Sequence, residues 1–410
     1  MIPGGAAPAS RLLVLLNELP VGVLALDATG HCEFRLLASW QTSVPRPVLG
    51  QVFEDDPVRA RRAKSRLPAW FSNLLPEGAL RELLKHGISE REFVLLQTLG
   101  ADLPGAVRVV PAGEADGADT LPGAAALESD EVDAAAGWHF SLAGVQLKFS
   151  ALRTQRGMTV PVAGLGGDWI LKLPDQRYPG VPANEYATML WARASGITVP
   201  ECALIDLAAV SGLPASIRPP RGERQAFVIR RFDRPASGRR IHIEDFAQVL
   251  DLYPERKYER FNIETIARIT LALAGPDDLA ELVRRLVFLV ASGNGDAHHK
   301  NWSLQYPDGL KARLSPAYDL VSTIQYLPDD RMALNFGGSK RWQDVRLDTF
   351  RRLARKIGSD ETRLVAQTVE AIEAVQRAWL MHAADFGYDA AQRRRLDVHM
   401  SEVPLLSTSG

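Results

Sequence analysis

Cysteine is scarce in this chain of 410 residues, which contains only Cys32 and Cys202. The two lie far apart and neither belongs to a C-x-x-C pair. No disulfide framework or structural zinc site can therefore be built from them, and we expect two buried thiols.

Long apolar runs are also absent. No stretch reaches the roughly 18 apolar residues of a membrane-spanning helix. Residues 12–19 are apolar, but they lack the basic start and the small-residue cleavage site of a secretory signal. These absences predict a soluble protein of the reducing cytoplasm, without a membrane partner.

Net charge is small, because 48 Lys and Arg residues nearly cancel 49 Asp and Glu residues. That balance argues against a chain whose main task is to coat nucleic acid or an anionic membrane. The basic stretch at residues 59–64 is interpreted as the solvated face of a helix. The length and the 46% hydrophobic content indicate two or three globular units, and no internal repeat is present.

The first part of the chain reads as a small α/β unit. Strands are predicted at residues 21–26 and 33–37 around a turn, and short helices at 76–85 and 89–99. Residues 112–136 are rich in Ala, Gly, Asp and Glu and contain no aromatic residue. That composition is typical of a flexible linker or loop.

The remainder changes from strands to helices. Strands are predicted at residues 147–152, 169–173 and 226–232, with a helix at 184–195 between them. Apolar residues then recur at helical spacing up to Gly293, and residues 348–400 indicate two or three amphipathic helices. The expected fold is α+β, with two lobes that close on a cleft.

Polar residues are concentrated directly after the helix that ends at Gly293. Residues 293–301 contain an aspartate, two histidines, a lysine and two asparagines. Phosphoryl transfer needs a carboxylate near the attacking hydroxyl and an oxygen ligand for Mg²⁺ close by. Asp296 and Asn301 can supply both, whereas the alternative is an Asx-rich turn that caps the helix.

Asp319, within the motif at residues 314–319, suits a second Mg²⁺ ligand, because this cation prefers carboxylate oxygen. Taken alone, it would more often cap a helix. Lys172 lies in an apolar strand, where an ammonium group needs an anionic partner such as ATP phosphates or Glu185. The alternative for Lys172 is an edge strand that points it to water.

A turn of small residues precedes the strand at residue 147, and its backbone N–H groups can approach phosphate oxygens. It is not a Walker loop, since G-x-x-x-x-G-K-[ST] occurs nowhere in the chain. The glycines at residues 164–167 indicate a hairpin turn. The candidate phosphate-binding residues are Ser141, Leu142, Ala143, Gly144, Val145, Gln146 and Lys148.

The order of these parts follows that of protein kinases, although the H-R-D and D-F-G sequence motifs are absent. The chain resembles the HipA-type serine/threonine kinases, the toxins of bacterial toxin–antitoxin systems. The resemblance covers about residues 20–390. It is carried by the motifs at residues 67–78, 100–106, 141–148, 170–174, 184–185, 230–234, 293–301 and 315–319.

The resemblance implies a kinase fold with an added N-terminal subdomain. The predicted parts are residues 1–111 as that subdomain, 112–136 as the linker, 137–233 as the N-lobe and 234–410 as the helical C-lobe.

The resemblance also implies roles for single residues. Asp296 would be the catalytic base, Asn301 and Asp319 would hold Mg²⁺, and Lys172 would contact ATP phosphates with Glu185 as its ion-pair partner. Further roles concern the hinge, the catalytic motif and autophosphorylation. Backbone groups at Arg230 and Phe232 would meet adenine, His298 and Lys300 would order the catalytic loop or contact phosphate oxygens, and Ser141 would be the autophosphorylated serine.

The implied partners are a HipB-like helix-turn-helix antitoxin, operator DNA held mainly through that antitoxin, and a protein substrate such as an aminoacyl-tRNA synthetase. Two alternatives stay open. Aminoglycoside-type small-molecule kinases share the D-x4-N arrangement, and an inactive scaffold of a repressor complex is the other.

Overall fold

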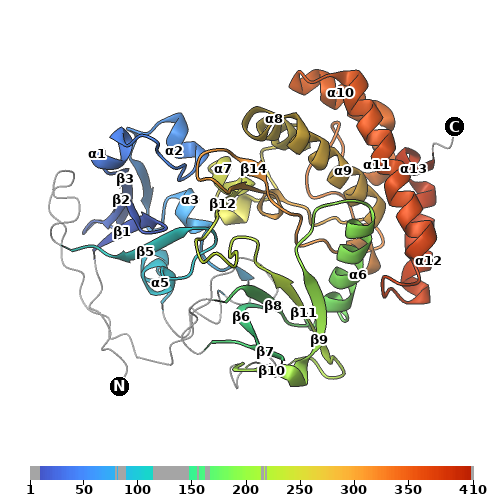
Figure 1. Cartoon of the computed structure of the whole chain (residues 1–410), viewed down its shortest axis with the longest axis horizontal. Coiled ribbons are helices and arrows are strands. Elements are labelled where there is room, and N and C mark those ends of the chain that lie inside the picture. The colour runs from blue at the N-terminus through green and yellow to red at the C-terminus, as the bar shows by residue number, and fades with distance from the viewer. Residues whose placement is uncertain are drawn as a thin grey trace.

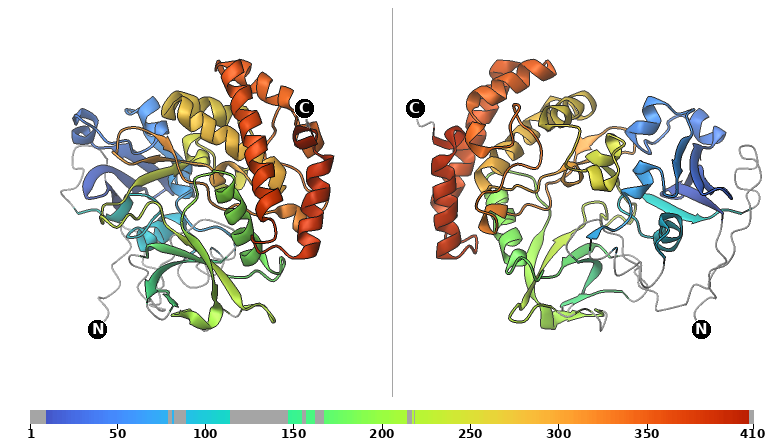
Figure 2. Two further views of the ribbon diagram at one scale, coloured as in Figure 1. Left: turned by 45° about the vertical axis from the view of Figure 1, so that its right-hand side comes forward. Right: turned by 180° about the vertical axis from the view of Figure 1, so that it is seen from behind.

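The computed structural model describes residues 10–78, 81, 89–113, 147–154, 157–161, 167–213, 217 and 219–407. In Figure 1 an N-terminal group of strands and short helices, coloured blue, lies at one end of the molecule. The orange and red helices of the C-terminal part lie at the other end, and a green sheet lies beside both. The view from behind in Figure 2 shows the same three groups.

The N-terminal group is built on a five-stranded antiparallel sheet with strand order β4-β3-β2-β1-β5. Buried residues alternate with partly exposed ones along β3, as expected for a sheet with one inward face. The strands are β1 (Arg11–Leu16), β2 (Leu19–Leu26), β3 (His31–Leu36), β4 (Arg61–Lys64) and β5 (Val107–Pro111). The helices are α1 (Ala38–Thr42), α2 (Gln51–Asp55), α3 (Ala69–Ser72) and α5 (Glu92–Leu99).

The predicted strands at residues 21–26 and 33–37 are confirmed as β2 and β3, and the helix predicted at 89–99 as α5. The helix expected at residues 59–64 is wrong. Arg61–Lys64 forms an edge strand that pairs with β3, and its side chains alternate between partly buried and exposed. Charged residues are common on such edges because they discourage pairing with another chain.

The second group holds a six-stranded sheet with order β10-β7-β6-β8-β11-β9. Helix α6 begins earlier than the predicted residue 184, because a proline in its first turn suits a helix start. The elements are β6 (Lys148–Thr154), β7 (Gly157–Thr159), β8 (Trp169–Lys172), α6 (Val181–Ala194), β9 (Cys202–Asp206), η1 (Leu207–Ala209), β10 (Val210–Ser211) and β11 (Gln225–Arg230).

The C-terminal group is mainly helical, as the apolar spacing predicted. It adds a small antiparallel sheet of β12 (His242–Asp245), β13 (Ser303–Tyr306) and β14 (Arg313–Leu314). Its long helices are α8 (Ile263–Ala274), α9 (Pro276–Ser292), α10 (Leu347–Ile357), α11 (Glu361–His382) and α12 (Ala390–Glu402). The shorter ones are α7 (Phe246–Val249), η2 (Pro254–Arg256), η3 (His299–Asn301), η4 (Thr323–Gln325), η5 (Trp342–Asp344) and α13 (Pro404–Ser407).

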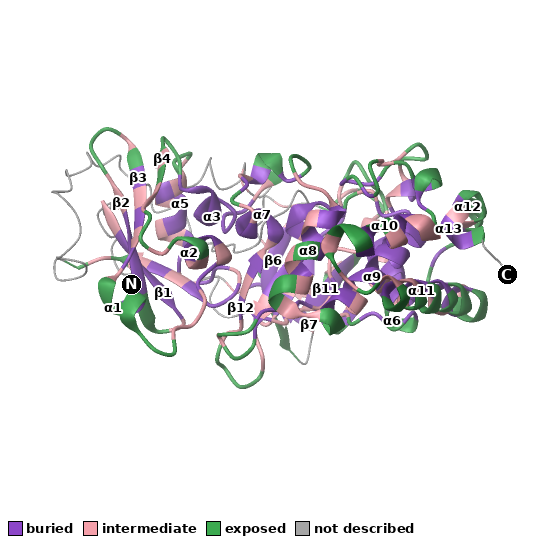
Figure 3. Cartoon of the chain, turned by 90° about the horizontal axis from the view of Figure 1, so that it is seen from above, coloured by how far each residue is buried: buried purple, intermediate pink, exposed green. Residues whose placement is uncertain are grey.

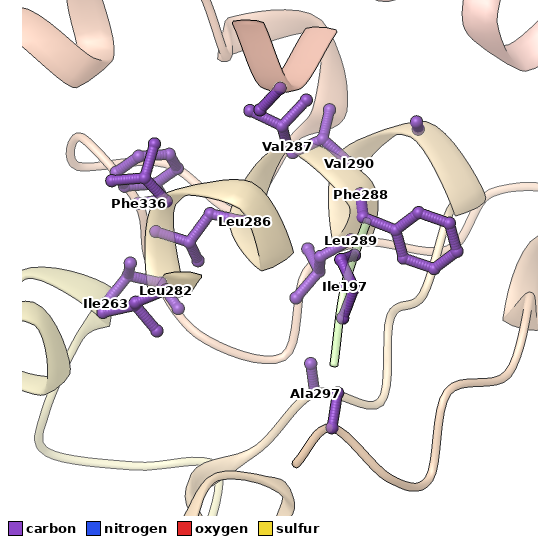
Figure 4. Close-up of a cluster of buried hydrophobic side chains, with 14 of the residues drawn as sticks. Ile197, Ile263, Leu282, Leu286, Val287, Phe288, Leu289, Val290, Ala297 and Phe336 are labelled. Carbon is purple, nitrogen blue, oxygen red and sulfur yellow. The ribbon is translucent and has the colours of Figure 1, made fainter. Parts of the chain in front are cut away.

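Two large hydrophobic cores hold these groups together, and buried residues run through the middle of the molecule in Figure 3. One core joins the N-terminal sheet to the inward faces of β6 and β8, so the first two groups share a single apolar interior. The other surrounds α9. Figure 4 shows Leu282, Leu286, Val287 and Val290 of this helix in that core, with Ala297 of the polar loop at its edge.

Both cysteines are buried and free, as expected. In the described residues no helix is both long and apolar enough to cross a membrane.

Candidate active site

One pocket of about 560 Å³ lies where the three groups meet. Its volume is within the range of small-molecule and cofactor sites. Among the residues that line it are Asn73, Glu77, Lys148, Lys172, Glu185, Arg230, Phe232, Tyr258, Asp296, His298, Lys300, Asn301 and Asp319. Every described residue that the sequence singled out for chemistry therefore lies around one space.

The polar loop after α9 is shaped by the helix end. Gly293 closes α9 with a φ of 60°, the left-handed conformation that favours glycine at this position. A Cβ there would also lie 2.6 Å from Cδ1 of Ile324. Beyond it, the Asn294 side chain accepts a hydrogen bond from the Asp296 amide (3.1 Å). The loop is thus held by this internal hydrogen bond and by the buried side chain of Ala297. It does not serve only as a helix cap.

Asp296 opens into the pocket. Its backbone carbonyl accepts hydrogen bonds from the Asn301 side-chain amide (2.8 Å) and the His298 N–H (2.7 Å). Its carboxylate accepts one from the Tyr258 hydroxyl (2.6 Å). Desolvation by surrounding protein raises the pKa of Asp296, although the Tyr258 hydrogen bond and the charge of Lys257 act against it. A carboxylate so placed can accept a proton from a hydroxyl group.

Lys172 is the last residue of β8, which lies between β6 and β11. Trp169 and Leu171 point into the shared core. Because successive side chains of a strand face opposite sides of the sheet, Lys172 faces the pocket. The expected alternative of a solvated edge-strand lysine is therefore wrong. The Nζ atom contacts Oε1 of Glu185 and Oδ1 of Asp319, and the Lys172 and Glu185 side chains are 4% and 1% exposed.

Asp319 is bound by two ammonium groups, because Lys148 Nζ also lies 2.9 Å from its Oδ2. Burial alone would raise the pKa of Asp319, but Lys148 and Lys172 outweigh it and hold the pKa well below the ordinary value. Asp319 has a φ of 54° and does not cap a helix, since the next helical turn begins at Thr323. The capping alternative is wrong.

Asn301 and Asp319 offer the hard oxygen donors that Mg²⁺ prefers. Because Asn301 donates through its amide nitrogen to the Asp296 carbonyl, its amide oxygen is the end that can face a cation. In the described part of the chain, no cluster of three His, Cys, Asp or Glu residues could hold a metal by itself.

Lys300 points away from solvent into a buried ionic cluster. Its Nζ lies 2.9 Å from both side-chain and backbone oxygens of Asn73, 3.1 Å from Glu77 and 3.2 Å from Asp245. His298 packs edge-on against the Tyr258 ring, and burial lowers its pKa to about 3, so the ring is neutral. Both residues brace the loop in this structure.

Arg230 and Phe232 lie on the pocket wall, at the end of β11 and two residues after it. The strand predicted to reach residue 232 stops at Arg230, whose N–H donates to the Glu201 carbonyl (2.8 Å). The Phe232 ring lies 5.8 Å from that of Tyr318. The two residues thus reach the pocket from the connection between the sheet and the helical group.

The predicted phosphate loop is outside the described residues apart from its last position. This applies to Ser141, Leu142, Ala143, Gly144, Val145 and Gln146, and to most of the linker predicted at residues 112–136. Lys148 alone is described, and it pairs with Asp319 instead of standing free in a loop.

The pocket residues that the sequence did not single out include Asn73, Glu77, Lys257 and Tyr258. Asn73 and Glu77 belong to the segment at residues 67–78, which was noted only for its resemblance. A signal was present there, because Asn73 interrupts the apolar run from Trp70 to Leu75 and is 2% exposed. A buried asparagine needs polar partners.

Comparison with known proteins agrees with this geometry. Residues 12–110 match the model of the HipA N-terminal domain, and residues 140–379 match the HipA-like C-terminal domain. A relative in Sinorhizobium fredii, named putative kinase Y4dM, is 42% identical over 405 residues, which cover 96% of this chain and 97% of the relative. The serine/threonine-protein kinase toxin HipA of Shewanella oneidensis is 26% identical, with 76% of this chain and 75% of the relative covered.

A solved structure of the Shewanella oneidensis HipA, HipB and operator DNA complex has a chain with the same fold. The TM-score is 0.71 at 21% identity, with 97% of this chain and all of that chain covered. The fold is thus the two-lobed, kinase-like one with an additional N-terminal subdomain. The chain belongs to the HipA family and is a HipA-type kinase, a membership that implies the use of ATP.

Proposed function

We propose that this chain is an ATP-dependent serine/threonine protein kinase that acts as the growth-inhibiting toxin of a toxin–antitoxin pair. The observation that carries the proposal is the convergence of Lys172, Asp296 and Asp319, from three separate segments, on one pocket. An ammonium, a base and an oxygen ligand for a cation are the parts that phosphoryl transfer needs.

The residues divide the work of the reaction. Asp296 accepts the proton of the acceptor hydroxyl as that oxygen forms its bond to the γ-phosphorus and the bond to the β-phosphate bridging oxygen breaks. Lys172, oriented by Glu185, binds the nucleotide phosphates, and Lys148 joins it there. Asn301 and Asp319 would hold Mg²⁺, which would neutralise charge on the phosphates.

The walls of the pocket suit the rest of the nucleotide. Ile170, Ile229 and Phe232 line it beside the connection between the lobes. Backbone groups at Arg230 and Phe232 contact adenine there. His298 and Lys300 hold the loop from behind.

The proposed regulation and partners of this chain are taken from the HipA family. Ser141 is the proposed autophosphorylation site. The solved complex of the Shewanella oneidensis protein contains HipB and operator DNA, which supports a HipB-like antitoxin and DNA contact mainly through it. The proposed substrate class is a translation component such as an aminoacyl-tRNA synthetase.

A small-molecule kinase would share the D-x4-N loop. The match of residues 12–110 to the HipA N-terminal domain favours the protein kinase. An inactive scaffold would be expected to have lost one of the catalytic residues, yet Lys172, Asp296, Asn301 and Asp319 are all present.

The proposal is tested by brief induction of the wild-type chain beside Asp296→Asn, with phosphoproteomics and growth as readouts. We expect serine or threonine phosphorylation of a cellular protein and growth arrest with the wild type alone. Phosphate on a small metabolite and on no protein would replace the proposal with the small-molecule alternative. Full growth arrest by Asp296→Asn would contradict the kinase mechanism.

A further inference from the structure

Glu77, from the N-terminal subdomain, reaches the catalytic loop of the C-lobe. Its Oε1 lies 3.1 Å from Nζ of Lys300, which stands between Asp296 and Asn301 in the chain. The Lys300 side chain is 6% exposed and that of Glu77 is 13% exposed, so the contact is largely shielded from water. Asn73, four residues before Glu77, binds the same ammonium through two oxygens.

The second oxygen of Glu77 holds another segment beside Asp296. Its Oε2 accepts a hydrogen bond from Nζ of Lys257 (2.7 Å), a residue that is also buried. The Lys257 carbonyl accepts a hydrogen bond from the backbone N–H of His299 (3.2 Å) and also contacts Nδ1 of the His299 ring (2.7 Å). The next residue, Tyr258, donates to the Asp296 carboxylate.

One carboxylate therefore joins both segments that flank the proposed base. Glu77 contacts the catalytic loop through Lys300, and it contacts the segment that carries Tyr258 through Lys257. Two buried ammonium groups share this anion. Lys300 also has Asp245 at 3.2 Å, so the larger effect of losing Glu77 falls on Lys257, whose charge would lose the carboxylate that it contacts in a shielded place. In accord with this, Lys300 and Lys257 overcome the effect of burial and lower the pKa of Glu77 to about 2.

We infer that Glu77 is a positioning residue for phosphoryl transfer, through which the N-terminal subdomain fixes the two segments on either side of Asp296. The inference rests on the proposed function, since it takes Asp296 as the base. It gives the N-terminal subdomain a part in the chemistry itself. Glu77 lines the edge of the pocket, and the role assigned to it is indirect, through Lys300, Lys257 and Tyr258.

The test is autophosphorylation of the full chain with γ-labelled ATP, for the wild type and Glu77→Gln. Stoichiometric binding of mant-ATP counts the folded sites in each preparation, and the rate is expressed per site. We expect the rate at saturating ATP to fall by about tenfold to a hundredfold, the loss typical of a misplaced catalytic group. The half-saturating ATP concentration should change by less than about twofold, because Glu77 does not reach the phosphate-binding lysines.

Glu92→Gln is the matched control. Glu92 belongs to the same subdomain, its side chain is 12% exposed, and it binds Ser72 (2.8 Å), the Leu67 N–H (2.9 Å) and Arg81 (3.0 Å). These partners all lie within the subdomain. Glu92→Gln should lower its stability while the rate per site stays within about twofold of the wild type.

The outcomes separate the two ideas. A rate per site that is unchanged in Glu77→Gln, or that falls equally in Glu92→Gln, overturns the inference and leaves the kinase proposal intact. Equal label transfer by the wild type and Asp296→Asn overturns the proposed function instead. If Glu77→Gln does not fold, Lys257→Met removes the other end of the contact and is judged by the same rate per site.

Discussion

Lys172→Met removes an ammonium group that two carboxylates share. Glu185, whose side chain is 1% exposed, then loses the cation that it contacts, whereas Asp319 keeps Lys148 at 2.9 Å. Breaking a buried ion pair by removing one partner costs about 3–5 kcal/mol. Because Asp319 keeps a partner and Glu185 can take up a proton, we expect the lower end, about 3 kcal/mol of unfolding free energy near neutral pH.

The cost should depend on pH in a defined direction. Burial raises the pKa of Glu185 even though Lys172 acts against it, and without Lys172 the pKa rises further. A carboxyl whose folded pKa is raised stabilises the fold below its unfolded pKa, and this stability is lost as the pH rises through the folded pKa. The difference between wild type and Lys172→Met should therefore shrink as the pH falls from neutral into the acid range.

Urea unfolding followed by tryptophan fluorescence, without nucleotide and with EDTA present, measures this difference. The control is Lys172→Met combined with Glu185→Leu, which removes the orphaned carboxyl and should regain most of the stability while kinase activity stays absent. If Lys172→Met is as stable as the wild type near neutral pH, Lys172 does not stabilise the fold through these carboxylates. A difference that does not vary with pH would contradict such stabilisation as well.

Two further changes probe the loop and the contact between subdomain and C-lobe. Gly295→Ala should slow phosphoryl transfer by about tenfold or more, because the added Cβ would overlap the Asp330 carboxylate and lie 2.6 Å from the Arg331 carbonyl. Initial rates with labelled ATP measure the change. A rate equal to that of the wild type would contradict the loop geometry. Burial raises the pKa of Glu244 to about 7, although hydrogen bonds from Tyr306, Trp70 and the Gln51 N–H oppose the shift. The stabilising contribution of Glu244 is thus lost as the pH rises from about 4.5 through about 7. In urea titrations Glu244→Gln should therefore lose less stability over that pH range than the wild type. Parallel plots of unfolding free energy against pH for the two chains would contradict this prediction.

The sequence was sufficient for the elements with strong local signals. The apolar spacing before Gly293 predicted the end of α9. The spacing beyond residue 348 predicted two or three helices, and α10, α11 and α12 lie there. Local charge was misleading at residues 61–64, because pairing with β3 decides the conformation of an edge strand. A basic stretch carries no signal for such a long-range contact.

The sequence singled out candidate site residues where residue chemistry is unusual. A lysine in an apolar strand and a dense polar loop both stand out, and Lys172, Asp296, Asn301 and Asp319 do line one pocket. Glu77 and Tyr258 were missed because each is ordinary in its local sequence. Glu77 contacts Lys257 across about 180 positions of the chain, and Tyr258 contacts Asp296 across about 40. Only the tertiary fold reveals such contacts.

Asp296 is the residue on which the proposed phosphoryl transfer in this pocket depends. The most direct measurement is transfer of the labelled γ-phosphate from ATP to protein, with Mg²⁺ present, for the wild type and for Asp296→Asn. The two side chains have nearly the same shape, and mant-ATP binding checks that both chains are folded. We expect label on the wild type and a loss of at least about a hundredfold in Asp296→Asn at similar nucleotide affinity. Equal labelling of the two chains would contradict the account.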